Sequence, residues 1–417
     1  MNLADIIDTF ISGDWGEESP TEDTPNAAYC VRGADIVPIT NHNFTDIPQR
    51  YVCDRTKETK LLAAGDLVIE KSGGSPTQST GRIVYVSEDL IKVKGNVVCS
   101  NFCTAFRVKV GWNPLYVYYY WQNVYNQGAF FNFEGKTSGI KNLQLDNALS
   151  AIDIEHLPLE KQNQIVASLA SIDEKIKINR QINDNLEAMA KQLYEYWFVQ
   201  FDFPNEEGKP YKSSGGALVW NEKLKREIPQ EWSDCKLKDF INLFDSKRVP
   251  LSSKDRGERQ GVYPYYGATG IMDYVNDYIF DGDYILLAED GSTSDAKGFP
   301  IVQYIWGKNW VNNHAHIILP KNERYMMFTY QMLRSIPAKQ IETGSIQKKI
   351  SQENLCGYKM VLPNSNLLEK YENVVSPLWE KRKRCIEEIN TLTRQRDELL
   401  PLLMNGQASV NYHLSAC

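Results

Sequence analysis

Two long stretches of the chain have the heptad spacing of coiled-coil helices. Each follows a Leu-Pro pair, which is Leu157-Pro158 in the first case and Leu362-Pro363 in the second. Within residues 158–200 and 364–406, seam positions recur at alternating intervals of three and four, which aligns them in one narrow stripe. Such a stripe suits a single partner helix better than a domain core, so we expect the two helices to pair.

The two seams combine apolar residues with a few polar ones. Asn179 and Asn183 lie on the first seam, and Arg382 and Arg396 lie on the second. Polar seam residues fix the register of a helix pair at some cost in stability. The first seam consists of Leu169, Ile172, Ile176, Asn179, Asn183, Leu186, Ala190, Leu193 and Trp197. The second consists of Tyr371, Val375, Leu378, Arg382, Cys385, Ile389, Leu392, Arg396, Leu399 and Leu403.

The pattern also bears on where these helices begin and end. The first is expected to run from about Leu159 to Val199. In the second, Pro377 predicts either a kink or the start of the helix, with Ser376 as the N-cap. The periodicity also leaves open two unrelated amphipathic helices, each packed on a local core.

The chain contains an internal repeat of about 200 residues, which indicates a duplicated domain rather than a solenoid. Gly65–Ile69 also resembles Gly282–Leu286, each being a turn that enters a strand, at a different offset. The positions that match at an offset of 205 are Gly139 with Gly344, Leu145 with Ile350, Leu157 with Leu362, and Pro158 with Pro363.

A globular region of mixed secondary structure precedes each long helix. The expected class is α+β, with residues 1–157 and 234–363 as the two globular domains, residues 201–233 as a connector rich in turn formers, and residues 407–417 as a tail. The expected strands are residues 82–86, 97–108, 284–287, 301–305 and 314–319. Residues 116–125 and 325–333 are expected to be helical.

Charge and cysteine content limit the function classes. The net charge is −7, with 13 basic and 19 acidic residues in 1–155 and 16 and 15 in 234–363. A DNA-binding role would therefore require local basic clusters or a partner that neutralises phosphates. The eight cysteines are scattered, so we expect reduced thiols and no metal site. No apolar run spans a bilayer and no secretory signal is present, so a cytoplasmic protein is expected.

Short motifs at the helix ends, in the connector and in the second domain link the chain to a known family. These motifs are Leu157–Gln162, Tyr194–Phe203, Tyr211–Gly216, Val219–Glu222, Glu227–Trp232, Tyr265–Gly270, Glu289–Ser292, Val311–His316 and Leu399–Gly406. On these residues the chain resembles the specificity (S) subunits of type I restriction–modification systems, over nearly its whole length. It departs from the family at Leu159, where a second proline is common, and in the tail, which has no counterpart.

The resemblance implies a non-catalytic DNA-recognition subunit. Two target-recognition domains would each read one half of a split site in double-stranded DNA. The two helices would form an antiparallel pair that spaces these domains and docks two methyltransferase subunits, and a restriction and translocation subunit would join the complex. The chain itself would hold no cofactor, because S-adenosylmethionine, ATP and Mg²⁺ belong to the partner subunits.

The helix length itself fits a reader of two half-sites. About 40 residues at 1.5 Å per residue make a helix of roughly 60 Å, which spans about 17 base pairs. Because the two halves differ in sequence, we expect an asymmetric bipartite target with an unread spacer. The alternatives from other classes are a single-chain restriction enzyme and a coiled-coil adaptor with no DNA role.

Candidate base contacts are polar side chains in or beside Gly/Ser-rich loops. Arg and Lys suit guanine, and Asn and Gln suit adenine. The candidates of the first domain are Lys71, Ser72, Gln78, Thr80, Arg82 and Lys94. Those of the second are Tyr265, Tyr266, Thr269, Ser292, Thr293, Ser294, Lys297, Asn312, Asn313 and His314. The Gly-rich loops could equally be ordinary turns, and His314 could be a hydrogen-bonded core histidine.

Three stretches have the appearance of catalytic or metal-binding motifs. Asn113–Tyr116 approaches the catalytic loop of adenine methyltransferases but lacks its second proline and a cofactor loop. Asp283 with Asp295–Lys297 mimics the acids and lysine of a nuclease site. His314 and His316 alternate along an expected strand, which places them on one face, but no third metal ligand can be placed. We therefore expect no catalytic residue and no metal.

Overall fold

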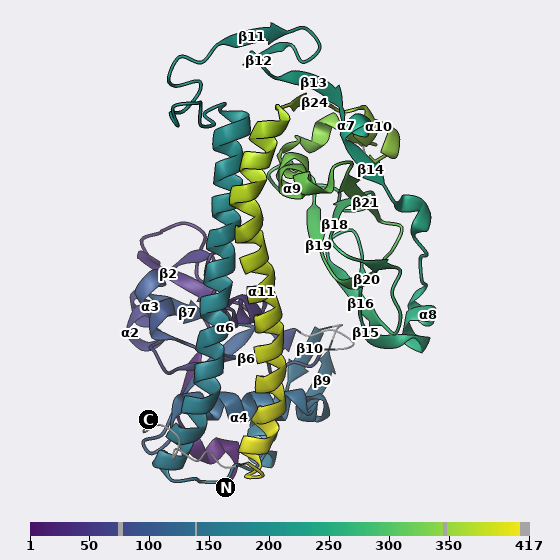
Figure 1. Cartoon of the computed structure of the whole chain (residues 1–417). Coiled ribbons are helices and arrows are strands. Elements are labelled where there is room, and N and C mark those ends of the chain that lie inside the picture. The colour runs from purple at the N-terminus through teal and green to yellow at the C-terminus, as the bar shows by residue number, and fades with distance from the viewer. Residues whose placement is uncertain (74–77, 138–139, 345–347, 409–417) are drawn as a thin grey trace, which may run out of the picture. The chain divides into compact units, whose positions relative to one another are not determined.

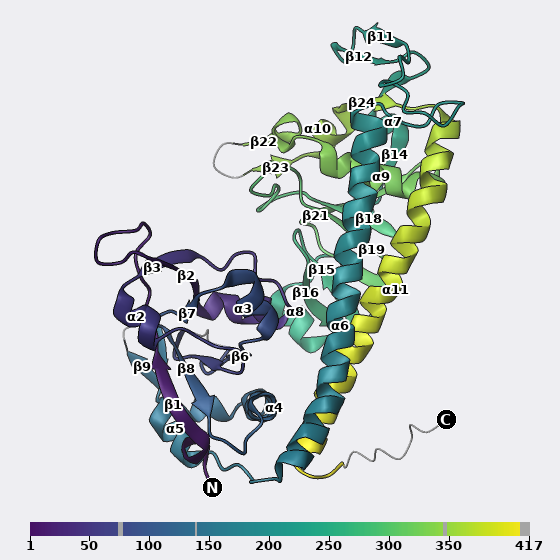
Figure 2. The same cartoon turned by 90° about the vertical axis from the view of Figure 1, so that its left-hand side faces the viewer.

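The computed structural model describes residues 1–73, 78–137, 140–344 and 348–408. The chain divides into two compact units. Unit 1 consists of Met1–Gln181 together with the chain from Cys385 onward, and unit 2 consists of Ile182–Arg384. Each unit contains one mixed α/β domain and a segment of each long helix, and Figures 1 and 2 show their elements in two views. The α+β class expected from the sequence is confirmed.

Unit 1 is built on a four-stranded antiparallel sheet in the order β1-β8-β4-β6. A second sheet, β3-β2-β7, has one parallel pair between β2 and β7, and a third has the order β5-β10-β9. The strands are β1 (Ile7–Ser12), β2 (Asn26–Val31), β3 (Gln49–Val52), β4 (Leu67–Glu70), β5 (Ser72–Gly73), β6 (Ile83–Tyr85), β7 (Val97–Cys99), β8 (Cys103–Val108), β9 (Glu134–Thr137) and β10 (Ile140–Leu143). The helices are η1 (Leu3–Ile6), η2 (Gly33–Asp35), α1 (Ile36–Thr40), α2 (Asp54–Thr59), α3 (Glu88–Lys94), α4 (Pro114–Asn126), η3 (Ala129–Phe133) and α5 (Leu145–Ala151).

Unit 2 has the corresponding antiparallel sheet, β14-β21-β18-β19, and a mixed sheet, β16-β15-β20-β17, in which β15 and β20 are parallel. The strands are β11 (Leu218–Asn221), β12 (Arg226–Pro229), β13 (Ser233–Lys236), β14 (Ile241–Leu243), β15 (Gln260–Tyr266), β16 (Ile271–Val275), β17 (Phe280–Asp281), β18 (Tyr284–Ala288), β19 (Val302–Ile305), β20 (Lys308–Val311), β21 (Ala315–Pro320), β22 (Glu342–Thr343), β23 (Lys349–Ile350) and β24 (Lys359–Leu362). The helices are α7 (Leu237–Phe240), η5 (Asp245–Lys247), α8 (Ser253–Glu258), η6 (Glu323–Tyr325), α9 (Met326–Ser335), η7 (Ala338–Gln340) and α10 (Gln352–Gly357).

The two units share one topology. In each principal sheet the first strand pairs with the last, the last with the second, and the second with the third. The duplication expected from the sequence is therefore confirmed, although one matched pair was misaligned. Leu145 begins helix α5 whereas Ile350 ends strand β23, so the counterpart of Ile350 is Leu143 at the end of β10.

The long helices are α6 (Leu159–Tyr194), followed by the π-helical turn η4 (Glu195–Val199), and α11 (Ser365–Met404). In unit 1, Arg396 contacts Asp173 at 3.0 Å and Asn179 contacts Glu388 at 2.9 Å. Since a later residue of α6 meets an earlier residue of α11, the segments are antiparallel, as Figure 1 shows. In unit 2, the pairing is also antiparallel, with Arg382 bonded to Glu187 and the Tyr371 hydroxyl donating to the Ala190 carbonyl.

The heptad seams are mostly correct. The seam positions of α6 are buried or half-buried, and Leu169 and Ala190 are fully buried. For α11 one alternative is excluded and one seam position was wrong. The helix begins at Ser365 and continues through Pro377, so Pro377 does not mark its start. Leu399 is 36% exposed, whereas Leu400 is 4% exposed and packs in the core of unit 1.

This shift of the seam gives a direct stability test. Leu400→Ala is expected to lower the free energy of unfolding by about 2–4 kcal/mol, because it removes a buried side chain and leaves a cavity. Leu399→Ala, its exposed neighbour on the same helix, should change it by less than about 0.5 kcal/mol. Urea unfolding of the two variants compares them directly. A larger loss of unfolding free energy for Leu399→Ala than for Leu400→Ala would instead support the seam expected from the sequence.

Most expected strands and helices are present, with two differences. Residues 97–108 form two strands rather than one, because a turn closed by the Cys103 amide and the Ser100 carbonyl separates β7 from β8. The connector is more ordered than its turn-rich sequence predicts. It contains the β11–β12 hairpin, and Phe201, Phe203 and Trp232 pack together in the aromatic core of unit 2.

Two further properties concern the described part of the chain. No helix in it has the length and apolar character required to cross a membrane. The cysteines in it are free thiols, and burial raises the pKa of Cys30 and of Cys99 to about 12. These thiols are packing groups of the β-sheet core of unit 1 rather than nucleophiles.

Candidate nucleic-acid interface

In unit 1 a buried glutamate ties the β9–β10 hairpin to the loop that precedes β6. Glu134 accepts hydrogen bonds from the Thr80 amide at 2.7 Å and the Thr80 hydroxyl at 3.2 Å, and it pairs with Lys141 at 2.9 Å. Burial would raise the pKa of Glu134, but the bonds from Lys141 and Thr80 outweigh burial and lower it. Glu134 therefore joins strands β9 and β10 to Thr80.

Unit 2 repeats this arrangement with different residues. Glu342, at the start of the β22–β23 hairpin, accepts from the Thr293 hydroxyl at 2.6 Å and pairs with Lys348 at 3.1 Å. The carboxylate is buried, whereas the Lys348 side chain is 53% exposed. In each hairpin the glutamate is paired across the two strands with the residue two positions after the lysine. Glu134 is paired with Leu143, and Glu342 with Ile350. The same Glu-Thr-Lys tie thus occurs in each unit.

Sequence reasoning selected the two threonines of this tie but missed Glu134, Lys141, Glu342 and Lys348. The second hairpin is one residue shorter between its paired ends, so a constant offset does not align the four residues. A search for a glutamate and a lysine flanking each Gly-containing turn before the Leu-Pro pairs would have found them.

The other candidates of unit 1 are divided among its three sheets. The Ser72 hydroxyl is hydrogen-bonded to Asn142 on β10. Gln78 is exposed, and its backbone carbonyl accepts from the Lys141 ammonium at 3.4 Å. Arg82 donates two hydrogen bonds to the Glu70 carboxylate, at 2.7 and 2.8 Å, and therefore has a structural role. Lys94 lies over the ring of Tyr29 on the β3-β2-β7 sheet, apart from the hairpin.

Lys71 lines an open depression of about 570 Å³ in unit 1. Its side chain forms no hydrogen bond or ion pair within the described residues. Ser12, Thr104, Gln144 and Asn147 line the same depression. A free lysine among hydroxyl and amide groups offers both a phosphate contact and donors for base edges.

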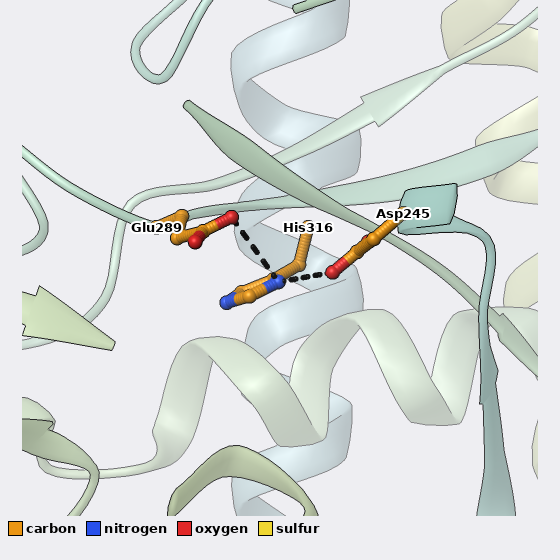
Figure 3. Close-up of side chains that lie close together, drawn as sticks. All are labelled: Asp245, Glu289 and His316. Carbon is orange, nitrogen blue, oxygen red and sulfur yellow. Dashed lines mark hydrogen bonds and ion pairs between the residues drawn. The ribbon is translucent and has the colours of Figure 1, made fainter. Parts of the chain in front are cut away.

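In unit 2 a buried ion network supports the corresponding surface. Figure 3 shows Asp245, Glu289 and His316 close together; Asp245 lies on η5, Glu289 directly follows β18, and His316 lies on β21. The His316 ring is fully buried, and its nitrogens face the Asp245 carboxylate at 2.6 Å and the Ile350 carbonyl at 2.7 Å. Both ring nitrogens are therefore engaged by oxygen atoms of the protein.

Arg248 and Lys349 complete the network. Arg248 donates to Glu289 at 2.8 Å and Lys349 pairs with Glu289 at 3.2 Å. Burial would raise the pKa of Asp245, but hydrogen bonds from His316 and from the Ile317 amide outweigh it and lower the pKa. The buried charges are thus compensated within the protein.

The same cluster revises the expectation about metal ligands. Asp245, Glu289 and His316 place their ligand atoms within 4.8 Å of one another. The structure therefore brings together three potential metal ligands that the sequence did not reveal. His314, by contrast, is exposed and does not join them. The geometry fits a metal poorly, because both ring nitrogens of His316 already contact protein oxygens and both carboxylates are already paired with cationic side chains.

Several exposed candidates of unit 2 gather above this network. Lys348 donates to the Ser294 hydroxyl at 3.4 Å, and the His314 ring donates to Asp290 at 2.6 Å. Asp290 and Lys349 also pair through an isolated backbone β-bridge, and Arg248 donates to the Asn313 carbonyl. Ser292 and Asn313 are exposed on the same segments. Lysine, amide, hydroxyl and imidazole donors therefore share one surface.

Other predicted contacts lie in the interior or elsewhere. Thr80, Tyr265, Thr293 and Asn312 are buried at 3% exposure or less, and each is bonded within its unit, so none of them is free to contact DNA in this structure. Tyr266 is half-buried in a hydrophobic cluster, and burial raises its pKa to about 12. Thr269 and Lys297 are exposed, Lys297 beside the end of α6.

The stretches with the appearance of catalytic motifs have structural roles. Asn113 caps α4 by accepting from the amides of Leu115 and Tyr116. Asp283 is bonded to Tyr304 and Lys383, whereas Asp295 accepts from the backbone amides of its own loop.

The fold and the site define a class of protein: two topologically equivalent units, each with a lysine-bearing hairpin tied to a polar loop, in a chain with two long helices. The chain matches the family model of the type I restriction modification DNA specificity domain over residues 22–188 and 229–370, and it belongs to that family.

Individual relatives agree with this assignment. The chain is 36% identical over 332 residues to the HindI specificity subunit of Haemophilus influenzae, covering 63% of this chain and 70% of that protein. It is 33% identical over 142 residues to the putative specificity subunit S.HindORF215P of the same organism, but this match spans only 34% of this chain and 35% of that relative.

A solved structure shares the fold. The type I restriction–modification S subunit from M. genitalium superposes with a TM-score of 0.54 at 16% identity, covering 97% of this chain and 95% of that one. At this identity the comparison concerns the fold alone.

Proposed function

We propose that this chain is the DNA-recognition subunit of a type I restriction–modification complex and has no catalytic activity of its own. Each unit reads one half of a split target in double-stranded DNA. The observation that carries the proposal is the hairpin-and-loop surface, which occurs once in each unit of a chain whose two halves both match the specificity family.

The two surfaces carry different side chains, which supports an asymmetric target. Unit 1 presents Lys71, Gln78 and Asn147, and amide groups suit adenine while lysine suits guanine. Unit 2 presents Lys348, Asn313 and His314. The two surfaces thus offer different donors and acceptors, so the half-sites are expected to differ.

Charge supports a role within a complex. The net charge of −7 opposes tight binding to DNA by this chain alone. We propose that modification subunits, two per chain, dock on the long helices and share the phosphate contacts, and that a restriction and translocation subunit joins them in the cytoplasm. S-adenosylmethionine, ATP and Mg²⁺ are then held by these partners. The length of α6 and α11 is proposed to set the unread spacer of the target.

Methylome sequencing of the host tests the proposal. With the gene present, one asymmetric split motif is expected to be methylated, and deletion of the gene should abolish that methylation. Replacing residues 1–155 with the corresponding domain of a relative should change one half of the motif and leave the other half intact. A palindromic motif, or a change in both halves, contradicts the assignment of one half-site to each unit.

A further inference from the structure

Unit 1 contains a cavity of about 190 Å³ that lies apart from the hairpin surface. Helices α1 and α4 and strand β6 supply one side of it, and α6 and α11 supply the other. Ile39, Val84 and Leu115 line its apolar wall, and Tyr85 and Ser87 contribute hydroxyls. An apolar cavity of about 150 Å³ holds benzene, so this cavity has room for one aromatic ring.

Two arginines line the cavity, and only one of them is ion-paired within the described residues. Arg396 lines it and is paired with Asp173 at 3.0 Å and with Asp397 at 2.8 Å. Arg180, from α6, lines it too, and its guanidinium has no hydrogen bond or ion pair with any part of the chain that the structure describes. Burial, and then the charge of Arg396, lower the pKa of Arg180. Two adjacent guanidiniums of which one is unpaired favour an anion between them.

The acids of the cavity do not supply that anion, because they are already paired. Asp173 accepts from the Tyr119 hydroxyl at 2.5 Å as well as from Arg396. Glu174 pairs with Lys177, which also pairs with Asp89 at 2.8 Å. The acids of the cavity that the structure describes therefore leave room for a further anion beside Arg180.

His42 adds an unsatisfied polar group to the cavity. It has a φ of 58°, a left-handed conformation that is uncommon for a residue other than glycine. Its Nδ1 is buried without a hydrogen-bond partner, and it lines the cavity. Burial, and then Lys177, lower the pKa of His42, so the ring is neutral at neutral pH and offers one donor and one acceptor. A strained residue with an unpaired buried nitrogen is typical of a ligand contact.

We propose that this cavity binds a small organic anion, a carboxylate or a phosphate ester whose apolar body is no larger than one aromatic ring. Arg180 binds the anionic group, His42 donates or accepts one hydrogen bond, and the apolar wall holds the body. This site goes beyond the proposed reading of DNA, because duplex DNA does not enter a cavity of this size.

Isothermal titration calorimetry of the full-length chain without DNA tests the site with two probes, benzoate and phenyl phosphate. At least one probe should bind with a stoichiometry of one. Inorganic phosphate, which has the charge but no body, should bind at least tenfold more weakly. Arg180→Gln should weaken binding at least tenfold. Arg394→Gln, which changes an exposed arginine on α11 that does not line the cavity, should leave it unchanged.

A second variant separates the cavity from the outer surface. Ala170 lines the cavity, so Ala170→Leu fills part of it while keeping Arg180, and binding should be lost. Circular dichroism and the unfolding midpoint establish that each variant is folded. Failure of both probes to bind, equal binding of inorganic phosphate, or full binding by Arg180→Gln or Ala170→Leu would overturn the proposal. None of these outcomes bears on the methylated motif, so the two proposals fail separately.

Discussion

Replacing Asp245 with alanine is expected to lower the free energy of unfolding of unit 2 by about 3–5 kcal/mol, because it leaves a buried ionic partner uncompensated. Asp245 accepts from His316 at 2.6 Å, from the Ile317 amide at 2.9 Å and from Gln352 at 2.5 Å. Without the carboxylate, the His316 ring and the Ile317 amide lose this acceptor in the interior, whereas Gln352 is exposed. The network also holds the β22–β23 hairpin through Ile350, so methylation of the proposed motif should be lost as well.

Asp290→Ala is the matched control. Asp290 also pairs with a histidine at 2.6 Å, but the side chains of His314 and Asp290 are 48% and 29% exposed. An exposed pair of this kind contributes about 0–1 kcal/mol. Urea unfolding followed by tryptophan fluorescence measures both variants. If Asp245→Ala were no more destabilising than Asp290→Ala, the buried network would not be a determinant of stability.

Glu372→Gln is expected to remove a pH dependence of the stability of unit 2. The Glu372 carboxylate is buried at the start of α9, where it accepts from the Phe328 amide at 2.8 Å and from the Ser376 hydroxyl at 2.9 Å. Burial outweighs these hydrogen bonds and raises the pKa of Glu372 to about 7. Between the unfolded pKa, about 4.3, and the folded one, the folded state binds more protons.

The sign of the effect follows from this difference in proton binding. The favourable contribution of protonated Glu372 is fully present below the unfolded pKa and is lost as the pH rises through 7, by up to about 4 kcal/mol. Glu372→Gln stays neutral, so its stability relative to the wild type should increase from pH 5 to pH 8. Glu369→Gln, which changes an exposed residue one turn earlier on α11, should follow the wild type at each pH. A constant difference between Glu372→Gln and the wild type would show that Glu372 is ionised throughout.

The sequence predicted best those features that repeat along the backbone. The heptad spacing identified both long helices and most of their buried positions, such as Leu169, Ile176 and Leu392. The turn-to-strand pattern of Gly65–Ile69 and Gly282–Leu286 identified β4 and β18 as equivalent strands. These features follow from the period of 3.6 residues in a helix and of 2 residues in a strand.

The sequence predicted individual polar residues poorly. Thr80, Thr293 and Asn312 are polar residues of the kind common in surface loops, yet all three are buried. Thr80 and Thr293 are buried because a glutamate on a hairpin, Glu134 or Glu342, accepts their hydroxyl hydrogen bonds. Glu134 and Glu342 lie about fifty residues further along the chain, so local composition does not reveal the pairing.

The sequence by itself determined the duplicated α+β organisation and the two heptad helices, because periodic side-chain patterns encode secondary structure locally. The tertiary structure alone decided that Leu400 rather than Leu399 faces the core, that Asp245, Glu289 and His316 share one buried network, and that Arg180 faces a cavity without a partner. The physical reason is that the burial and charge state of a polar side chain depend on neighbours brought together from distant parts of the chain.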